Sequence, residues 1–346
     1  MKYIGIIKRS DFMFNEIVKA DINKSSTAEK KKVYFKFIEV LPIIALLIAI
    51  TLHLVIPNKQ SFTTTKYYPT LLKAFIIIYF ILLVSSIKVK KIFDILVNKG
   101  PLLTVAVILL ELWDIVTLKL KLLPLPYFPG PDKVLSTLVS DWSLLGISTL
   151  YSLRLLFTGY IIGAILGLIT GISTGWNQRA NYWIGPLQKI IGPIPATAWI
   201  PIALTIFPTS FWASVFIIVL GVWFPVTVMT SSGIANVQNS FFEVAKALGA
   251  NKRYLIFKVA IPAAFPTIFI GLFMGLGTSF LTLIVSEMLG VKAGLGWYIN
   301  WAQGWADYSK VYASLIVIGV IFSSIITLLF KVKDKVLVWQ RGLIKW

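Results

Sequence analysis

Four ionisable residues lie inside or beside long apolar segments of this sequence. They are Glu111, Asp114, Arg154 and Glu287. A charge at the centre of a lipid bilayer costs about 2.5–3.5 kcal/mol on insertion scales, so such residues usually pair with one another or face water. Arg154 could neutralise any one of the three carboxylates, and the sequence does not choose among them. The pattern is equally compatible with an ion pair that joins helices and with a contact to a transported solute.

Other kinds of chemistry find little support in the sequence. Glu111 and Asp114 could suggest paired carboxylates for hydrolysis, but they lie on an apolar segment without a nucleophile or a partner at metal-ligand spacing. The chain has no cysteine and a single histidine, His53, to which we assign no role. It also has no G-x-x-x-x-G-K-[ST] loop, which would bind nucleotide phosphates. We therefore expect no catalytic residue, no metal and no cofactor in this chain.

The composition indicates a membrane protein with several spanning helices. The 346 residues are 57% hydrophobic and 14% charged, and the mean hydropathy is +0.83. A soluble domain could not bury so much apolar surface. Apolar segments of about twenty residues without strict alternation favour helices over a β-barrel. The predicted fold class is all-α, a polytopic membrane helical bundle with about eight spanning helices, at residues 40–56, 71–87, 102–118, 148–172, 184–208, 211–229, 262–285 and 310–330.

The net charge of +19 has a simple explanation in this topology. Lysine and arginine cluster in the N-terminal tail, after the second and fourth apolar segments, in the segment 240–262 and in the C-terminal tail. With both termini in the cytoplasm, all these clusters lie on the inner side, as the positive-inside rule requires. Nucleic acid is not needed as a partner. The basic, amphipathic tail at residues 1–38 could lie on lipid of the inner leaflet or remain a disordered tail.

The longest charged interval in the second half of the chain is residues 241–262. Val244, Leu248 and Leu255 are among its apolar residues, which recur at three- and four-residue spacings, so each half is expected to form an amphipathic helix. Gly249 lies between the halves, where the missing Cβ permits a bend. The segment predicts two short helices at the membrane surface, each apolar on one side and basic on the other.

This segment resembles the EAA loop of ABC importer permeases. Glu243-Val244-Ala245 is followed by Gly249 and then by Val259-Ala260-Ile261-Pro262 at the spacing of that motif. In the family the loop is a coupling helix that docks on a cytoplasmic ATPase dimer, which binds ATP and Mg²⁺. The resemblance implies an ATPase-coupling role for Glu243, Ala245, Lys246, Ala247, Gly249, Ala250 and Arg253.

The proline-rich segment 184–208 is expected to be a broken helix. Pro193, Pro195 and Pro201 interrupt an apolar stretch, and such a break at membrane depth is tolerated where it is buried in protein or lines a water-filled cavity. The stretch 193–202 resembles a motif of the permease branch that imports sulfonates, taurine, nitrate, bicarbonate and thiamine precursors. The predicted translocation path comprises Pro195, Trp199, Pro201, Trp223, Glu287 and Arg154. A kinked packing helix is the alternative for each of these residues.

Two further patterns match the same branch. Glycines at 159, 163, 167 and 171 form a stripe on one helix face, which we interpret as a packing surface. Ser286-Glu287-Met288-Leu289-Gly290 matches an acidic-Met-Leu-Gly motif of the branch. The resemblance implies a MetI-like type I ABC importer permease core at residues 101–331, with the coupling loop at 240–262. Residues 39–100 then form an extra two-span region, and residues 332–346 a basic cytoplasmic tail.

The predicted function is that of the transmembrane permease of an ATP-driven importer in the bacterial cytoplasmic membrane. A substrate-binding protein would deliver a small solute such as a sulfonate, nitrate, taurine or a small heterocycle such as a thiamine precursor. Because one chain carries one EAA-like loop, two permease copies are needed, most simply as a homodimer. The alternative is an ion-gradient-driven transporter or channel, which would predict corresponding broken helices in two halves of the chain.

Overall fold

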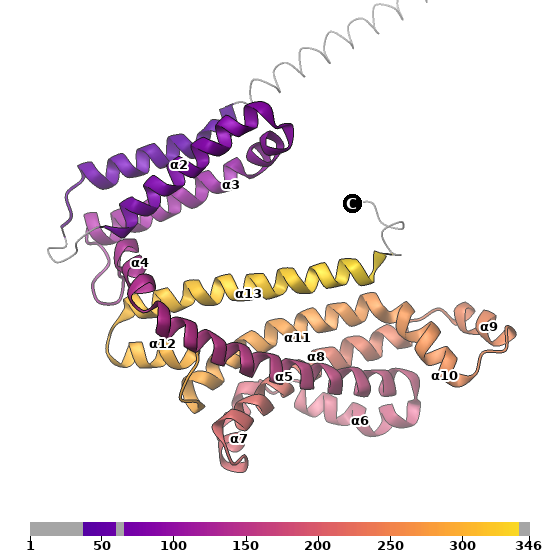
Figure 1. The fold of residues 1–346 in the computed structure, drawn as a ribbon. Helices are drawn as coiled ribbons and strands as arrows, with labels where there is room; N and C mark the ends of the chain where they lie inside the picture. Colours follow the sequence, from indigo (N-terminus) through magenta and orange to yellow (C-terminus); the bar gives the residue numbers. More distant parts are fainter. Residues whose placement is uncertain (1–36, 60–65, 339–346) are drawn as a thin grey trace, which may run out of the picture. The chain divides into compact units, whose positions relative to one another are not determined.

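The computed structural model describes residues 37–59 and 66–338, and all regular structure in these ranges is helical (Figure 1). Residues 1–36 of the tail predicted at 1–38, and the last eight residues of the C-terminal tail, lie outside the described residues. The chain forms two compact units, Met1–Ser136 and Thr137–Trp346. The all-α fold class is therefore confirmed for the described part of the chain.

The N-terminal unit contains three long helices. They are Phe37–Val55, α2 (Tyr67–Lys88) and α3 (Lys90–Asp114), which continues as the π-helical turn η1 (Ile115–Lys119). Buried apolar side chains from all three helices form its core: Leu46, Ala49, Tyr68, Leu72, Tyr79, Leu96 and Val107. Long apolar helices whose outward faces remain exposed are what a lipid environment stabilises.

Helix α3 differs from the prediction at its start. The predicted two-span region ends at residue 100 and the predicted third span begins at residue 102, but α3 runs through Gly100 and Pro101 without a break. Proline can be accommodated in a spanning helix because neighbouring groups satisfy the freed backbone carbonyl. The helix also packs closely there, since a Cβ on Gly100 would lie 3.0 Å from the Ile38 carbonyl oxygen.

The linking segment after η1 is irregular, as its prolines predict. It leads to the short helix α4 (Pro131–Ser140). Proline at the first position and Asp132 in the first turn favour this start.

The C-terminal unit is organised around three packed helices: α5 (Trp142–Trp176), α8 (Ser210–Ala235) and α11 (Ile261–Gly290). A Cβ on any glycine of the predicted stripe would come within 2.6–2.8 Å of a side-chain carbon of α8; the opposing pairs are Gly159–Ile218, Gly163–Val222, Gly167–Val226 and Gly171–Thr230. The glycine stripe is therefore the surface on which α5 and α8 pack, as predicted.

The proline-rich segment is broken, as predicted. Helix α6 (Gln178–Ile191) and the pair η2–α7 (Ala196–Ile206) meet at an angle of 88° across a short break. Ile200 and Ala203 are buried against Ala213 and Ile217 of α8, while Pro193, Pro195 and Pro201 are exposed. The described residues include seven helices long and apolar enough to span a membrane, or eight if the broken pair counts as one span.

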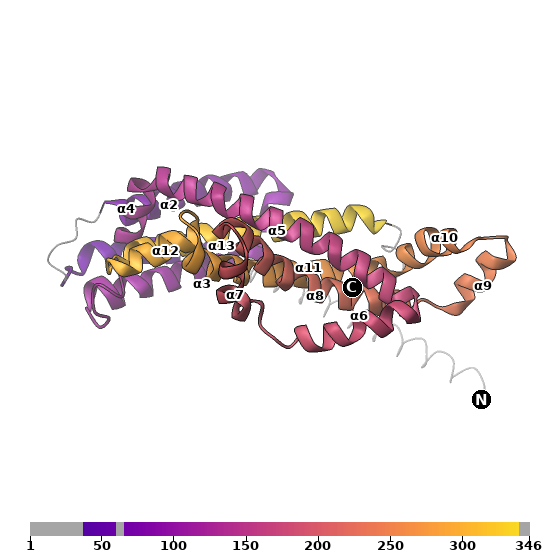
Figure 2. The ribbon, with the colours of Figure 1, turned by 90° about the horizontal axis from the view of Figure 1, so that it is seen from below.

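Of the remaining helices of this unit, α13 (Tyr308–Val336) packs along the core through Phe322 and Leu329, and the others lie near the two ends of α11. Helices α9 (Asn239–Ala247) and α10 (Lys252–Tyr254), with the π-helical η3 (Leu255–Ala260), connect α8 to α11. At the opposite end α12 (Leu295–Gly304) precedes α13. Figure 2 shows α9 and α10 projecting at one end of α11, with α12 at the other end.

Candidate coupling loop and translocation segment

The loop between α8 and α11 contains two short helical pieces joined at Gly249. Gly249 has φ +84°, a left-handed conformation that disfavours residues with a Cβ. The side chain of Asn251 then accepts a hydrogen bond from the Tyr254 N–H at 2.9 Å and caps the second piece. The expectation of two short helices with a bend at Gly249 is therefore confirmed.

The outer surface of this loop is apolar as well as basic. Leu248 is 84% exposed, Val244 62% and Phe241 52%. These side chains, with Tyr254, border a cleft of about 560 Å³ between the two helical pieces. Of the predicted coupling residues, five are exposed and two are half-buried: Glu243, Lys246, Ala247, Gly249 and Arg253 belong to the first group, Ala245 and Ala250 to the second.

The inner side of the loop is anchored to the three core helices. Ala260 is fully buried and packs with Ile234 of α8 and with Ala264 and Ile268 of α11. Phe242 of α9 meets Trp176 at the end of α5, edge to face, with ring centroids 5.6 Å apart. A force on α9 would therefore act directly on the ends of α5, α8 and α11, because the contacts are packed side chains rather than a flexible tether.

Three predicted path residues lie on the broken segment. Pro195 and Pro201 are exposed, and Trp199 is half-buried between them. The indole N–H of Trp199 has no hydrogen-bond partner among the described residues. An irregular backbone with an unsatisfied donor is the kind of local structure that a spanning bundle tolerates at a cavity or a protein interface.

Trp223 belongs to the contact between α5 and α8. Its indole N–H donates to Thr170 Oγ1 at 3.0 Å, and Thr170 Oγ1 lies 2.8 Å from Thr227 Oγ1. This polar contact joins α5 to α8 inside an otherwise apolar bundle. If one of these hydrogen-bonding groups were removed, water could not take its place.

Glu287, near the end of α11, is buried against the N-terminus of α12. Its side chain is 1% exposed, and its Oε2 accepts hydrogen bonds from the Ser152 hydroxyl at 3.0 Å and the Gly296 N–H at 2.8 Å. Ser152 also accepts a hydrogen bond from the Leu295 N–H at 2.8 Å. The carboxylate thus satisfies backbone groups at the N-terminus of α12 and connects α5, α11 and α12.

Arg154 and Glu287 are not brought together. The Arg154 side chain is exposed, and its guanidinium lies 5.2 Å from the centroid of the Phe211 ring. In the described part of the chain no ion pair joins it to a carboxylate. Of the pairings left open by the sequence, the one with Glu287 is absent from this conformation.

Sequence reasoning missed a second polar contact of the C-terminal unit. Asp141 Oδ2 accepts from the Tyr298 hydroxyl at 2.8 Å and from Lys310 Nζ at 3.1 Å. Burial pushes the pKa of Asp141 upward, but hydrogen bonds from Tyr298 and Lys310 outweigh it and hold the pKa below its ordinary value. These residues lie far apart in sequence and carry no motif, so no local signal could have found the contact.

The other intramembrane carboxylates belong to the N-terminal unit. His53 Nδ1 lies 2.7 Å from Asp114 Oδ2, and the Tyr68 hydroxyl donates to Glu111 Oε2 at 2.9 Å. The histidine to which the sequence assigned no role is therefore a buried partner of Asp114. Lys119, just beyond the predicted span 102–118, is also buried, and its ammonium donates to the carbonyl oxygens of His53 and Ile56. Within residues 37–59 and 66–338 no three of the metal-ligating side chains converge on one point.

Comparison with known proteins gives a consistent result. Residues 159–336 match the sequence family described as the binding-protein-dependent transport system inner membrane component. A putative ABC transporter permease of Methanocaldococcus jannaschii is 31% identical over 117 residues, which cover 34% of this chain and 44% of that protein. A bicarbonate transport system permease of Synechococcus elongatus is 33% identical over 116 residues, covering 34% of this chain and 42% of the relative.

Other similarities extend further along the chain. The formylaminopyrimidine transport permease of Halalkalibacterium halodurans is 27% identical over 157 residues, 45% of this chain and 62% of the relative. A solved structure of the MetNI methionine ABC transporter in an inward-facing form has 18% identity and a TM-score of 0.43, with 55% of this chain and 98% of that chain covered. The matched regions span about half the length of the curated relatives.

Proposed function

Because the chain belongs to the family of binding-protein-dependent transport system inner membrane components, we propose that it is the permease subunit of an ATP-driven importer. In this proposal α9 and the residues around Gly249 form the coupling element that receives a cytoplasmic ATPase. The observation that supports it most directly is the loop's two-sided construction. Apolar side chains such as Leu248 are exposed on its outer surface, while its inner side packs on α5, α8 and α11.

The ATPase contact would involve both shape and charge. Glu243, Lys246 and Arg253 are exposed and can form ion pairs at the rim of an interface, while Leu248 and Val244 provide its apolar centre. ATP and Mg²⁺ would be bound by the partner subunits. Closure of two ATPase subunits would push the loops and rock two permease halves around a central path, which is a rigid-body form of alternating access.

The proposed assembly contains two copies of this chain and an extracytoplasmic binding protein. One coupling loop per chain and two ATPase subunits make a homodimer the simplest arrangement. Multi-pass insertion in a cell membrane agrees with the family and with the apolar helices. Placing both termini in the cytoplasm is consistent with the distribution of lysine and arginine.

The proposed solute is a small anion or a small polar heterocycle. Relatives of this chain are bicarbonate, nitrate and formylaminopyrimidine permeases. In this proposal the break between α6 and α7 lines the path, with Pro195, Trp199 and Pro201 at the break and Trp223 nearby on α8. Glu287 would act on the path only after a change of conformation, since its carboxylate is buried at the N-terminus of α12. Arg154, whose side chain is exposed, completes the proposed path.

The decisive experiment is co-purification of the ATPase. The full-length chain would be purified in mild detergent from its native host and compared with Leu248→Glu. We expect a stoichiometric Walker-type ATPase with the unmodified chain, and its loss with the variant, because a charge would be placed at the centre of an apolar contact.

Leu122→Glu is the matched control for this substitution. Leu122 is 67% exposed in the segment after η1, far from the coupling loop in sequence, so the same change there should leave the ATPase bound. Retention of the ATPase by Leu248→Glu would contradict the coupling assignment. Purification of the chain without any nucleotide-hydrolysing companion, even after crosslinking at Lys246 or Lys252, would contradict the importer itself.

A further inference from the structure

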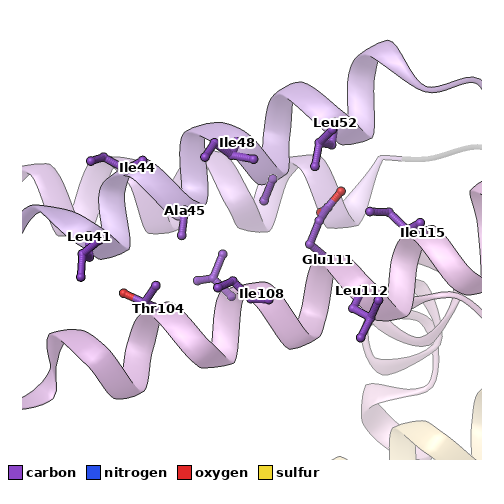
Figure 3. Close-up of a pocket in the computed structure, with 12 residues that line it drawn as sticks. Leu41, Ile44, Ala45, Ile48, Leu52, Thr104, Ile108, Glu111, Leu112 and Ile115 are labelled. Carbon is purple, nitrogen blue, oxygen red and sulfur yellow. The ribbon is translucent and has the colours of Figure 1, made fainter.

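The apolar groove of the N-terminal unit does not select a particular partner. It lies between the helix Phe37–Val55 and α3, and Figure 3 shows Glu111 among aliphatic side chains such as Leu52 and Ile115. Glu111 is 5% exposed, so its carboxylate is not available to an occupant of the groove. The hydrocarbon chains of a membrane satisfy an apolar face of this kind as well as apolar side chains do.

The cleft of the coupling loop differs because it combines apolar walls with an accessible charge. It lies between α9 and η3 and has a volume of about 560 Å³. Phe241, Val244 and Leu248 contribute apolar side chains from α9, and the exposed Lys258 of η3 is the charged residue of the lining. In the described part of the chain no ion pair joins Lys258 to a carboxylate. An occupant of the cleft therefore meets both apolar surface and a positive charge.

A partner that covers this cleft would remove the Lys258 ammonium from water. A charge that becomes buried without a counter-charge is strongly destabilising. The loop itself supplies no counter-charge at this place, because Glu243 is its one acidic residue between positions 239 and 260 and does not line the cleft. A partner that buries the apolar walls must therefore bring a negative charge to Lys258.

The charge of the whole loop favours an acidic partner. Its exposed ionisable residues are four cations and one carboxylate: Lys246, Lys252, Arg253, Lys258 and Glu243. Such an excess of one sign attracts a surface of the opposite sign and orients it during the encounter. The loop as a whole and the cleft within it thus require the same kind of surface.

The apolar side chains around the cleft favour a protein over a lipid head group. Leu248 is 84% exposed and Val244 62%. A lipid phosphate could pair with Lys258 but would leave these side chains uncovered, whereas a protein surface can cover both. One turn of an α-helix, about 5.4 Å long and 10 Å wide, occupies about 420 Å³. The cleft can therefore hold an element of that size, such as a helix end or a tight turn.

We propose that this cleft receives a protruding element of the ATPase, which places a large apolar side chain between α9 and η3 and a carboxylate against the Lys258 ammonium. The inference rests on the proposed function and adds a contact to it: the coupling loop holds a part of the ATPase instead of only resting against it. Because the loop packs on α5, α8 and α11, a side chain held in the cleft can transmit a pull as well as a push.

The first measurement is zero-length cross-linking of the purified complex. The full-length chain, with its co-purified ATPase, would be treated with a carbodiimide, which joins an amine to a carboxylate only where the two are in contact. Mass spectrometry of the linked peptides would identify the partners. We expect Lys258 to be joined to an aspartate or glutamate of the ATPase.

Binding of the purified ATPase to variants measures the strength of the contact. Lys258→Met removes the charge and keeps an unbranched side chain, and we expect a dissociation constant about thirtyfold higher, the factor that about 2 kcal/mol supplies. When the cross-linked carboxylate of the ATPase is replaced by alanine as well, the double variant should lose little more than either single variant, because the pair is already broken.

Lys252→Met is the matched control for the loss of charge. Lys252 is exposed on the same loop but does not line the cleft, so its removal should change the dissociation constant by less than about fivefold.

Ala245→Phe tests the cleft while the charge of Lys258 is retained. Ala245 lines the cleft from α9, and a phenyl ring there would occupy the space that the ATPase element needs, so we expect weaker binding. Thermal unfolding of each variant would show that the loss of binding does not come from a loss of folding.

The outcomes separate this inference from the proposed function. An ATPase that binds Lys258→Met and Ala245→Phe as tightly as the unmodified chain would refute the inference and leave the proposed function intact. Loss of bound phosphatidylglycerol from Lys258→Met, at unchanged affinity for the ATPase, would identify a lipid phosphate as the occupant instead. A chain that binds no ATPase at all would refute the proposed function, and the inference with it.

Discussion

At the scale of single residues, the buried polar groups of this chain hold helices together. Asp141, Ser152 and Glu287 each contact groups on other helices within the C-terminal unit. In lipid a broken contact of this kind finds no water to replace it, so each pair contributes to the arrangement of the helices. Glu287 was predicted as a path residue; its environment in this conformation is that of a structural acceptor, and a role in the path stays a prediction.

The contact of Asp141 makes the stability of the C-terminal unit dependent on pH. Since the pKa of Asp141 in the folded protein lies below its ordinary value of 3.8, the stabilising effect is complete above that value and is lost as the pH falls through the folded pKa. We expect the unfolding temperature in detergent to decrease below about pH 4. Asp141→Asn should lower the unfolding temperature at pH 7 and weaken this acid dependence. An identical acid dependence in the variant would show that other carboxylates are responsible.

Ser152 separates a structural role of Glu287 from a role in transport. Ser152→Ala would remove a donor to Glu287 and an acceptor for the Leu295 N–H, so we expect a destabilisation of about 1–3 kcal/mol, measured by thermal unfolding. Ser173→Ala on the same helix is the control, because its hydroxyl donates to Ile169 within α5. An unchanged unfolding temperature together with reduced uptake would instead favour contact of this site with the solute.

At the scale of helices, the contact between α5 and α8 depends on the absence of side chains. Because the stripe residues of α5 are glycines, the two helix backbones can approach closely. Branched side chains of α8 then fill the space that a Cβ on each α5 glycine would need. Gly249, in the loop between α8 and α11, is explained differently. A Cβ there would have open space around it, but the left-handed backbone conformation of this residue disfavours any side chain. Two glycines can therefore be needed for different physical reasons.

Gly163→Ala tests the packing of α5 on α8. A Cβ at this position would lie 2.8 Å from the Val222 Cβ and 3.0 Å from the Val219 carbonyl oxygen, so the helices would have to separate. We expect a destabilisation of about 1–3 kcal/mol in a thermal unfolding assay.

Gly277→Ala is the matched control on α11. No atom lies within 4 Å of a Cβ there, and the higher helix propensity of alanine should leave stability unchanged or raise it by up to about 1 kcal/mol. Equal effects of the two substitutions would contradict the packing role of the stripe.

At the scale of the whole molecule, the chain belongs to an importer family, and its sequence contains one EAA-like loop and no nucleotide-binding loop. Transport as proposed therefore requires partners. We expect the purified complex to contain two copies of the 38.7 kDa chain, shown by light scattering or native mass spectrometry after gentle solubilisation. A single copy paired with a different permease chain would replace the homodimer by a heterodimer. A lone monomer that still binds the ATPase would contradict both.

Most of the helices could be predicted from the sequence because lipid imposes a simple condition. Every backbone group must be satisfied within the chain, so each long apolar segment was expected to be a helix. Pro193 and Pro195 lie at the break between α6 and η2, whereas Pro201 is in the first turn of α7. The start of α3 could not be predicted, since Pro101 is tolerated inside a helix for reasons that involve its neighbours. The coupling loop was predictable because its spacing is local.

The pairing of buried charges was decided by tertiary structure. From the sequence, Arg154 could pair equally well with any of three carboxylates. In the structure its guanidinium lies over the Phe211 ring instead. Asp114 contacts His53, and Glu287 accepts a hydrogen bond from the Gly296 N–H at the N-terminus of α12. Composition and periodicity determine which segments are helices and which faces are apolar. Which side chains meet depends on helix rotation and packing over long sequence separations, and no local pattern encodes it.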